Sequence, residues 1–317
     1  MKVFVTGASG FVGRRLVEML VESGHTVIAH DLRPLNISSS SSNSAFRIPH
    51  SAFNSIPHSA FETLEVVTGD LVKGEGLEQI ADSDAVVHLA AAGVKSAGRQ
   101  WDVCTSVNVA GTQTLLSVLG RCATRPVLFF PRTFYQDHLG TTPSLWENPY
   151  IATKEAATRL VERWLAQDCP AARVVFGTFF QVYGPGDDPD NLVNYAIRQL
   201  ASGQPALFGS GTALRDWIYI EDLARGVVAA LEESGDGLRR YDLGTGVGHS
   251  IQQMVEEIAR ALGVDAKASF DSTRDRGDSA VSGVARDLVP RWTPRYSLVA
   301  GIEGTIRPVW RGRRGDA

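Results

Sequence analysis

Residues Lys2–Asp31 read KVFVTGASGFVGRRLVEMLVESGHTVIAHD, and this stretch decides the fold. Val3–Val5 form a short apolar run that soon reaches a glycine, as a buried parallel strand does. Apolar residues then recur at helical spacing as far as Gly24, which is a suitable stop for a helix. Val27–Ala29 form a second apolar strand, which Asp31 closes. Strand, glycine turn, helix, strand and acid, in that order, predict a βαβ unit that binds a dinucleotide.

The three glycines of the turn and the acid each have a physical role in such a unit. Gly7 permits the tight turn out of the strand. Gly10 lets a pyrophosphate approach the backbone at a helix N-terminus, where free amides and the helix dipole favour anions. Gly13 lets the helix pack against the sheet, and Asp31 accepts hydrogen bonds from the ribose hydroxyls of the adenosine half. The alternative is an ordinary glycine-rich turn, which the flanking strands and the acid disfavour.

The composition is that of an ordinary globular protein, with 317 residues, 44% of them hydrophobic and 21% charged. This length suffices for one large domain or two lobes. A net charge of -4 argues against nucleic acid as a partner, and no apolar run is long enough to span a membrane. Because the first strand starts at residue 2, we expect no signal peptide. The three cysteines show no metal spacing, so free thiols in a reducing cytoplasm and no metal site are expected.

Residues 38–61 interrupt the regular pattern. Serine fills positions 38–42, and repeated Ser-Ala-Phe and Ile-Pro-His segments follow. Two prolines and the lack of a helical period predict a loop. His50 and His58 are conceivable metal ligands, but a duplicated surface insertion is the favoured interpretation, and we assign the segment no chemistry.

Strands and helices alternate along the next part of the chain. Apolar strands are predicted at Leu64–Val67, Ala85–Ala90 and Val127–Phe130, with a long helix over 101–120. This alternation predicts an α/β fold, a Rossmann-type doubly wound parallel sheet with the site at the carboxyl ends of its strands. His88 lies within an apolar strand, and we interpret it as a buried, hydrogen-bonded histidine rather than a catalytic one.

A helix that carries a tyrosine and a lysine is predicted after Asn148-Pro149, a cap residue followed by a first-turn proline. Tyr150 and Lys154 are four residues apart and therefore lie on one face of this helix. A free tyrosine has a pKa near 10, so base action at neutral pH requires a shift of about three units, or roughly 4 kcal/mol. An ammonium one turn away and an oxidised nicotinamide both favour the phenolate. The alternative for Tyr150 is a packing residue of an amphipathic helix.

In these motifs and their order, the sequence resembles the extended short-chain dehydrogenase/reductases, specifically the nucleotide-sugar epimerase/dehydratase family. The resemblance covers nearly the whole chain except the insertion at 38–61 and the tail. It is carried by Thr6-Gly7-x-x-Gly10-x-x-Gly13, Asp31, Gly69-Asp70-Leu71, His88-Leu89-Ala90-Ala91, Asn108-Val109-x-Gly111-Thr112, Tyr150-x-x-x-Lys154, Val182-Tyr183-Gly184-Pro185, Gly209-x-Gly211, Arg215-Asp216 and Asp242-Leu243-Gly244-Thr245-Gly246.

The resemblance implies an NAD cofactor and three catalytic residues. Tyr150 would take the proton of a sugar hydroxyl while a hydride leaves the same carbon. Lys154 would also hold the nicotinamide ribose, and Thr133 would hydrogen-bond the reacting oxygen. The implied cofactor-binding residues are Gly7, Ser9, Gly10, Phe11, Val12, Gly13, Asp31, Asp70, Leu71, Leu89, Ala90, Ala91, Asn108, Tyr150 and Lys154.

On the substrate side, the resemblance implies that Arg215 pairs with the diphosphate of a nucleotide sugar. Arg274 or Arg276 would add a second phosphate contact, and Gln181 stands where the family usually has an asparagine. We expect an NAD-binding domain over 1–177 and a smaller C-terminal substrate-binding lobe over 178–310, with some segments returning to the Rossmann sheet and a basic tail over 311–317.

The family also implies a homodimer that pairs through the helix over 101–120 and the Tyr150 helix. The apolar residues expected at that interface are Leu115, Leu116, Leu119, Leu160 and Trp164.

Departures from the family pattern flank the catalytic threonine. Pro131-Arg132 precede it where the family usually has serines, and Phe134-Tyr135 follow it where the dehydratases place Asp-Glu. Dehydration needs an additional acid/base pair, so a nucleotide-sugar epimerase, with C4 as the reacting carbon, is the leading hypothesis. The alternatives are an NAD(P)H-dependent reductase of a nucleotide-linked keto-sugar and a non-catalytic NAD(P)-binding sensor or scaffold.

Overall fold

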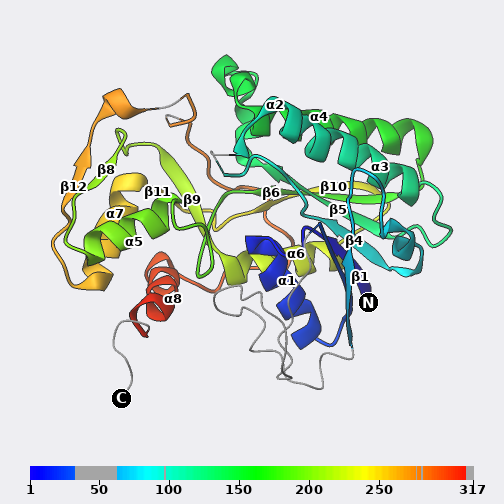
Figure 1. Ribbon diagram of the computed structural model, residues 1–317, viewed down its shortest axis with the longest axis horizontal. Coiled ribbons are helices and arrows are strands. Elements are labelled where there is room, and N and C mark those ends of the chain that lie inside the picture. The colour runs from blue at the N-terminus through cyan, green and yellow to red at the C-terminus, as the bar shows by residue number, and fades with distance from the viewer. Residues whose placement is uncertain (33–62, 96–97, 276, 280, 312–317) are drawn as a thin grey trace. The chain divides into compact units, whose positions relative to one another are not determined.

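The computed structural model describes residues 1–32, 63–95, 98–275, 277–279 and 281–311 (Figure 1). The insertion at 38–61, Arg276 and residues 312–317 of the tail lie outside the described residues. The chain divides into two compact units. The first comprises residues 1–132, 147–177 and 227–240, and the second comprises residues 133–146, 178–226 and 241–317.

A seven-stranded sheet forms the centre of the first unit, with the strand order β10-β6-β5-β4-β1-β2-β3. Its strands are β1 (Lys2–Thr6), β2 (Thr26–Asp31), β3 (Leu64–Thr68), β4 (Ala85–His88), β5 (Val127–Thr133), β6 (Arg173–Phe179) and β10 (Gly237–Leu243). β1 pairs in parallel with both β2 and β4, so the strand order reverses between β1 and β4. In doubly wound sheets, ligands bind at the carboxyl ends of the strands at such a reversal. The predicted Rossmann-type fold is confirmed.

Helices cover both faces of this sheet, which explains why the five strands inside its edges, β1, β2, β4, β5 and β6, are largely buried, whereas the edge strands β3 and β10 are partly exposed. α1 (Phe11–Glu22) lies on one face, and α2 (Trp101–Cys104), α3 (Gly111–Leu119) and α4 (Pro149–Arg163) lie on the other (Figure 1). The π-helical segment η5 (Thr105–Ala110) joins α2 to α3, and a second one, η8 (Trp164–Asp168), extends α4. A 3-10 helix, η3 (Leu77–Asp82), precedes β4.

The apolar residues expected at a dimer interface lie instead in the core of this unit. Leu115, Leu116, Leu119 and Trp164 are buried among the side chains of the sheet, and Leu160 packs against them. An apolar stripe at helical spacing does not by itself distinguish a face that covers a sheet from a face that meets a partner. Here the stripe covers the sheet, so the expectation that these four residues contact a second subunit is wrong.

The second unit contains two small sheets and several helices. β7 (Gln181–Tyr183) pairs in parallel with β9 (Leu214–Tyr219), which pairs antiparallel with β11 (Gly248–Ser250). β8 (Ala206–Phe208) pairs with β12 (Ala268–Phe270). The helices are α5 (Leu192–Ala201), α7 (Ile251–Leu262), α8 (Leu298–Arg311) and the 3-10 helices η6 (Phe134–His138), η7 (Pro143–Glu147) and η9 (Ser272–Arg274), while α6 (Ile220–Glu232) is divided between the two units.

Three general features bear on function. In the described part of the chain, no helix combines the length and apolar character needed to cross a membrane. The same residues contain no cluster of three or more side chains that could hold a metal ion. Cys104, Cys122 and Cys169 are all free thiols.

Candidate active site

The glycine turn lies at the carboxyl end of β1, where the sequence placed it. Gly7 has a φ of 68°, and a Cβ there would lie 2.6 Å from the backbone nitrogen of Ala90 at the end of β4. A Cβ on Gly13 would lie 2.2 Å from the carbonyl oxygen of Gly7, so α1 packs directly on the turn. Gly10 caps α1 without a side-chain hydrogen bond, which leaves first-turn amides for an anion. The site therefore fits the pyrophosphate of a dinucleotide.

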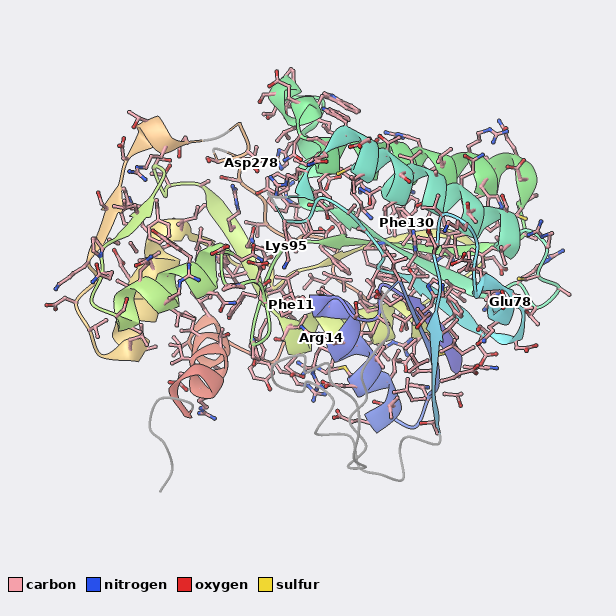
Figure 2. The ribbon with its side chains drawn as sticks, viewed as in Figure 1. Phe11, Arg14, Glu78, Lys95, Phe130 and Asp278 are labelled. Atoms are coloured by element: carbon pink, nitrogen blue, oxygen red, sulfur yellow. The ribbon has the colours of Figure 1, made fainter. Side chains whose placement is uncertain are left out.

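Asp31 ends β2 beside this turn. Its Oδ2 accepts a hydrogen bond of 2.9 Å from the backbone N–H of Ser9. The carboxylate thus fixes the conformation of the turn and stands at the carboxyl end of β2, where the ribose of an adenosine is bound in such units. Phe11, labelled in Figure 2, and Val12 form the first turn of α1 and are half-buried.

The ends of β3 and β4 supply the other predicted cofactor residues of this unit. Asp70 follows β3, and its Oδ1 accepts the backbone N–H of Val72 at 2.9 Å. Leu71 is buried in the core, whereas Ala90 and Ala91 are half-buried just beyond β4. Leu89 donates its backbone N–H to the carbonyl oxygen of Thr6, which ties the end of β4 to the end of β1.

Tyr150 and Lys154 lie one turn apart at the start of α4. Asn148 caps this helix, since its Oδ1 accepts the backbone N–H of Tyr150 at 3.1 Å. Lys154 is only 4% exposed, and its Nζ lies 4.6 Å from the centroid of the Phe130 ring on β5. Burial, assisted by the positive charge of Arg132, lowers the pKa of Lys154 to about 7. This arrangement gives the tyrosine a neighbouring amine that is held in one place.

Asn108 holds the end of β4 and the start of α4 together. Its Oδ1 accepts the backbone N–H of Ala92 at 2.8 Å, and its Nδ2 donates to Ala92 O at 3.1 Å and to Thr153 Oγ1 at 2.9 Å. Both amide hydrogens are therefore engaged with protein groups. Asn108 lies in the π-helical segment η5, and such segments are frequent at functional sites. The sequence alone predicted a cofactor contact for Asn108 and missed the role of Thr153.

Thr133 is the first residue of the second unit, whereas Tyr150 and Lys154 belong to the first. Its side chain and that of Gln136 form a capping box for η6, in which Gln136 Oε1 accepts the backbone N–H of Thr133 at 2.9 Å. The next residue, Phe134, is buried and stacks on Phe180, with ring centroids 5.6 Å apart. Gly283 leaves room for this ring, since a Cβ there would lie 2.3 Å from it. An apolar ring therefore occupies the position where a dehydratase needs a carboxylic acid.

Arg215, on β9, is a buried cation. It is 4% exposed, and its Nη2 donates to the carbonyl oxygens of Asp278 at 2.9 Å and Ser279 at 3.3 Å. The guanidinium lies 5.5 Å from the ring centroid of Phe134 and 5.7 Å from that of Tyr135. Among the described residues, no carboxylate forms an ion pair with it.

The neighbouring Asp216 does not neutralise Arg215. Its carboxylate accepts hydrogen bonds from the backbone and hydroxyl of Thr245, both at 2.7 Å, and from the backbone of Gly246 at 2.8 Å and Ala285 at 3.1 Å. A buried guanidinium without a carboxylate partner is costly unless an anion binds it. Arg215 is therefore suited to a ligand phosphate.

The other substrate-side candidates are less closely engaged. Arg274 is half exposed on η9, and its Nε lies 4.0 Å from Asp271. Gln181 begins β7 in register with Trp217 of β9 and is half-buried.

Comparison with known proteins identifies the family. A sequence model of the NAD dependent epimerase/dehydratase family matches residues 3–244. The chain belongs to this family. Family members that resemble it along nearly their whole length include UDP-glucuronate 4-epimerase of Thermodesulfobacterium geofontis, which is 28% identical over 95% of this chain and 94% of the relative. UDP-glucose 4-epimerase of Mycolicibacterium smegmatis is 27% identical over 96% of this chain and 97% of the relative.

Solved structures of other proteins share the fold. MoeE5 in complex with UDP-glucuronic acid and NAD is 26% identical, covers 98% of this chain and 100% of its own, and superposes with a TM-score of 0.78. UDP-glucose 4-epimerase of Thermotoga maritima, solved with UDP-glucose, has a TM-score of 0.77 at 22% identity, covers 99% of this chain and 100% of its own, and supports the fold alone. The predictions of an extended short-chain dehydrogenase/reductase, of an NAD-dependent enzyme and of the epimerase class are confirmed.

Proposed function

We propose that this protein is a nucleotide-sugar 4-epimerase that acts on a UDP-hexose. The observation that carries the proposal is the position of Tyr150 one turn before the buried Lys154 in α4, in the same unit as the glycine turn. The relatives in the family are named for UDP-glucose and UDP-glucuronate, which supports a uridine nucleotide and a six-carbon sugar. Arg215 supplies a cation for the diphosphate.

The residues of this chain account for the proton transfers of the reaction. The glycine turn and Asp31 would hold NAD, which would supply reversible hydride transfer at either face of C4 of the sugar. Tyr150 takes the proton of the C4 hydroxyl as the hydride departs and gives it back as the hydride returns. Lys154 favours the phenolate of Tyr150, and Thr133 hydrogen-bonds the reacting oxygen. The cycle therefore inverts C4 without net oxidation.

Dehydration of the sugar is disfavoured by the same residues. Removal of a proton beside the transient ketone and expulsion of the C6 hydroxyl need a further acid and base. Neither Phe134 nor Tyr135 is a carboxylate, and Phe134 is buried. Epimerisation requires no group beyond those already assigned.

The test is to incubate the protein with catalytic NAD and, separately, UDP-glucose, UDP-glucuronate and UDP-N-acetylglucosamine. The products are separated by anion exchange and assigned by proton NMR. We expect inversion at C4 of one of these sugars without net change in NADH. A 4-keto-6-deoxy product would contradict the argument from Phe134, and stoichiometric consumption of NADH with a keto-sugar would favour the reductase.

We expect NAD(H) to bind more tightly than NADP(H). Asp31 would repel a 2'-phosphate and accept a hydrogen bond from a free 2'-hydroxyl. The matched variant Asp31→Asn retains an oxygen for the N–H of Ser9 but loses the charge. It should therefore lower the preference for NAD(H) over NADP(H) by about tenfold, or about 1.4 kcal/mol. Fluorescence titrations with the two reduced cofactors measure this ratio, and tighter binding of NADPH to the wild type would refute it.

Arg215→Met should raise KM for the UDP-sugar by about 10- to 100-fold. This increase corresponds to the loss of a charge-assisted hydrogen bond to the diphosphate, which contributes roughly 1.5–3 kcal/mol. NAD affinity should not change, because Arg215 is not among the residues assigned to the cofactor. Arg198→Met is the matched control, since Arg198 also lies over a tyrosine ring of the second unit but pairs with Asp190. Equal KM values for wild type and Arg215→Met would remove Arg215 from the substrate site.

Epimerisation should slow as the pH rises through about 7, because Lys154 then loses its proton. Burial is the main cause of this low pKa, and the charge of Arg132 contributes. Arg132→Met removes that charge, so the pKa of Lys154 should rise and the descending limb of kcat should move to higher pH. Arg121→Met, at an exposed arginine beyond α3, is the control in the pH–rate profiles. A limb that stays in place would contradict the role assigned to Arg132.

We also propose a homodimer and a cytoplasmic location. The three free cysteines are consistent with a reducing compartment. Because the leucines of α3 are buried, we assign the dimer contacts to exposed apolar residues of α2, Trp101 and Val103. Light scattering at micromolar concentration measures the mass, and a monomer would refute the dimer.

A further inference from the structure

His88, at the end of β4, lies in a continuous chain of buried hydrogen bonds. The imidazole is 2% exposed, its Nδ1 lies 2.8 Å from Thr6 Oγ1, and its Nε2 lies 3.2 Å from Thr112 Oγ1. Both threonines are also buried. Thr6 precedes the glycine turn on β1, and Thr112 lies in α3, so the ring bridges the sheet and a helix on its face.

The partners of the two threonines fix the direction of every bond. Thr112 Oγ1 donates its single proton to the carbonyl oxygen of Asn108 at 2.6 Å, so toward His88 it can only accept. His88 Nε2 therefore carries the proton, and Nδ1 accepts the hydroxyl proton of Thr6. Thr6 Oγ1 in turn accepts the backbone N–H of Ala90 at 3.2 Å. Each polar atom has a partner only if the ring is the neutral Nε2–H tautomer.

The chain of bonds continues to the helix that carries Tyr150. Asn108 donates to Thr153 Oγ1 at 2.9 Å, and Thr153 Oγ1 donates to the carbonyl oxygen of Pro149 at 2.6 Å. The connected groups thus run from the strand before the glycine turn, through β4 and η5, to the first turn of α4. All of them belong to the first unit.

We infer that His88, as the neutral Nε2–H tautomer, is a positioning residue that sets the ends of β1 and β4 relative to the Tyr150–Lys154 turn of α4. Its effect on catalysis rests on the proposed epimerase function, whereas its tautomer and its effect on NAD binding do not. The bridge matters because a displacement of about 1 Å at a reacting centre can cost about 100-fold in rate.

The electrostatic surroundings agree with a neutral ring. Burial is the main cause that lowers the pKa of His88 to about 3, and the charges of Lys154 and His30 add to it. The pKa of His88 is lower in the folded protein than in the unfolded chain, so between about pH 6.5 and 3 the unfolded chain binds a proton at His88 that the folded protein does not. The free energy of unfolding should therefore fall as the pH drops through this window.

The first test is 15N NMR of histidine-labelled protein from pH 5 to 9, with His88 assigned by its loss in His88→Gln. The expected spectrum shows a neutral Nε2–H ring that does not titrate. Titration in this range, or protonation at Nδ1, would overturn the inference, and this result does not depend on the substrate.

The second test measures function in variants. His88→Leu leaves Thr6 and Thr112 without the ring, and we expect kcat to fall about 10- to 100-fold and the NAD dissociation constant to rise about tenfold. His88→Gln supplies an amide donor and acceptor in place of the ring nitrogens, so this variant should keep most of the wild-type kcat and NAD affinity. If His88→Leu fails to fold, Thr112→Val should show the same loss of kcat and of NAD affinity. Thr124→Val, whose exposed hydroxyl donates to Ala81 O, is the matched control. Equal NAD affinity and kcat in wild type and Thr112→Val would refute the positioning role.

Discussion

Tyr150→Phe is expected to lower kcat for epimerisation by about 1,000-fold while NAD affinity stays within about twofold of the wild type. The change removes only the phenolic hydroxyl, and the ring retains its place in the first turn of α4. Without the hydroxyl, no group of the pair takes the proton as the hydride departs. The loss should therefore fall on the chemical step.

The measurement combines steady-state epimerisation with titration of NAD. Tyr195→Phe is the matched control, because Tyr195 lies in the second unit and its hydroxyl accepts the backbone N–H of Leu207 at 3.1 Å. Its kcat should equal that of the wild type. If Tyr150→Phe kept most of its activity, Tyr150 would not be the base.

Lys154→Met should have opposite effects on activity and stability. Loss of the ammonium removes the cation beside Tyr150, so kcat should fall by about 100- to 1,000-fold. The ammonium is buried against Phe130, and no carboxylate among the described residues forms an ion pair with it. Methionine fills a similar volume without a charge, so the variant should be more stable by about 1–2 kcal/mol at pH 6.

The pH dependence of this stability difference provides its control. The pKa of Lys154 is about 7 in the folded protein, whereas a lysine ordinarily has a pKa of 10.5. Between these two pH values, Lys154 is therefore more protonated in the unfolded chain than in the folded protein. The destabilisation by Lys154 is therefore complete below pH 7 and is relieved as the pH rises. Urea unfolding at pH 6 and 9 should show a smaller advantage of Lys154→Met at pH 9. Equal free energies of unfolding for Lys154→Met and the wild type at pH 6 would contradict the account.

Much of the cofactor side could be predicted from the sequence because its determinants are local. The tight turn at Gly7 and the close packing at Gly13 involve residues of one βαβ unit, and their spacing reveals them. The helix start at Asn148 and the Tyr150–Lys154 face follow in the same way from capping and a period of 3.6 residues.

Other features depend on contacts between distant residues, which spacing does not encode. Arg215 meets the backbone of Asp278, 63 positions away, so its burial without a carboxylate partner was not predictable. The leucines of α3 formed an apolar stripe, but their contact with the sheet was decided by tertiary packing. The effect of Arg132 on Lys154 likewise joins a strand to a helix.

The most direct test of the central claim uses UDP-glucose deuterated at C4, or the UDP-hexose identified as substrate, with unlabelled NAD. Mass spectrometry and proton NMR then locate the deuterium after partial conversion in the presence of excess unlabelled NADH. An epimerase that holds its cofactor through the cycle predicts a product with inverted C4 that retains the deuterium at that carbon. Deuterium in the NADH pool, or a product that has lost the label from C4, would contradict the account.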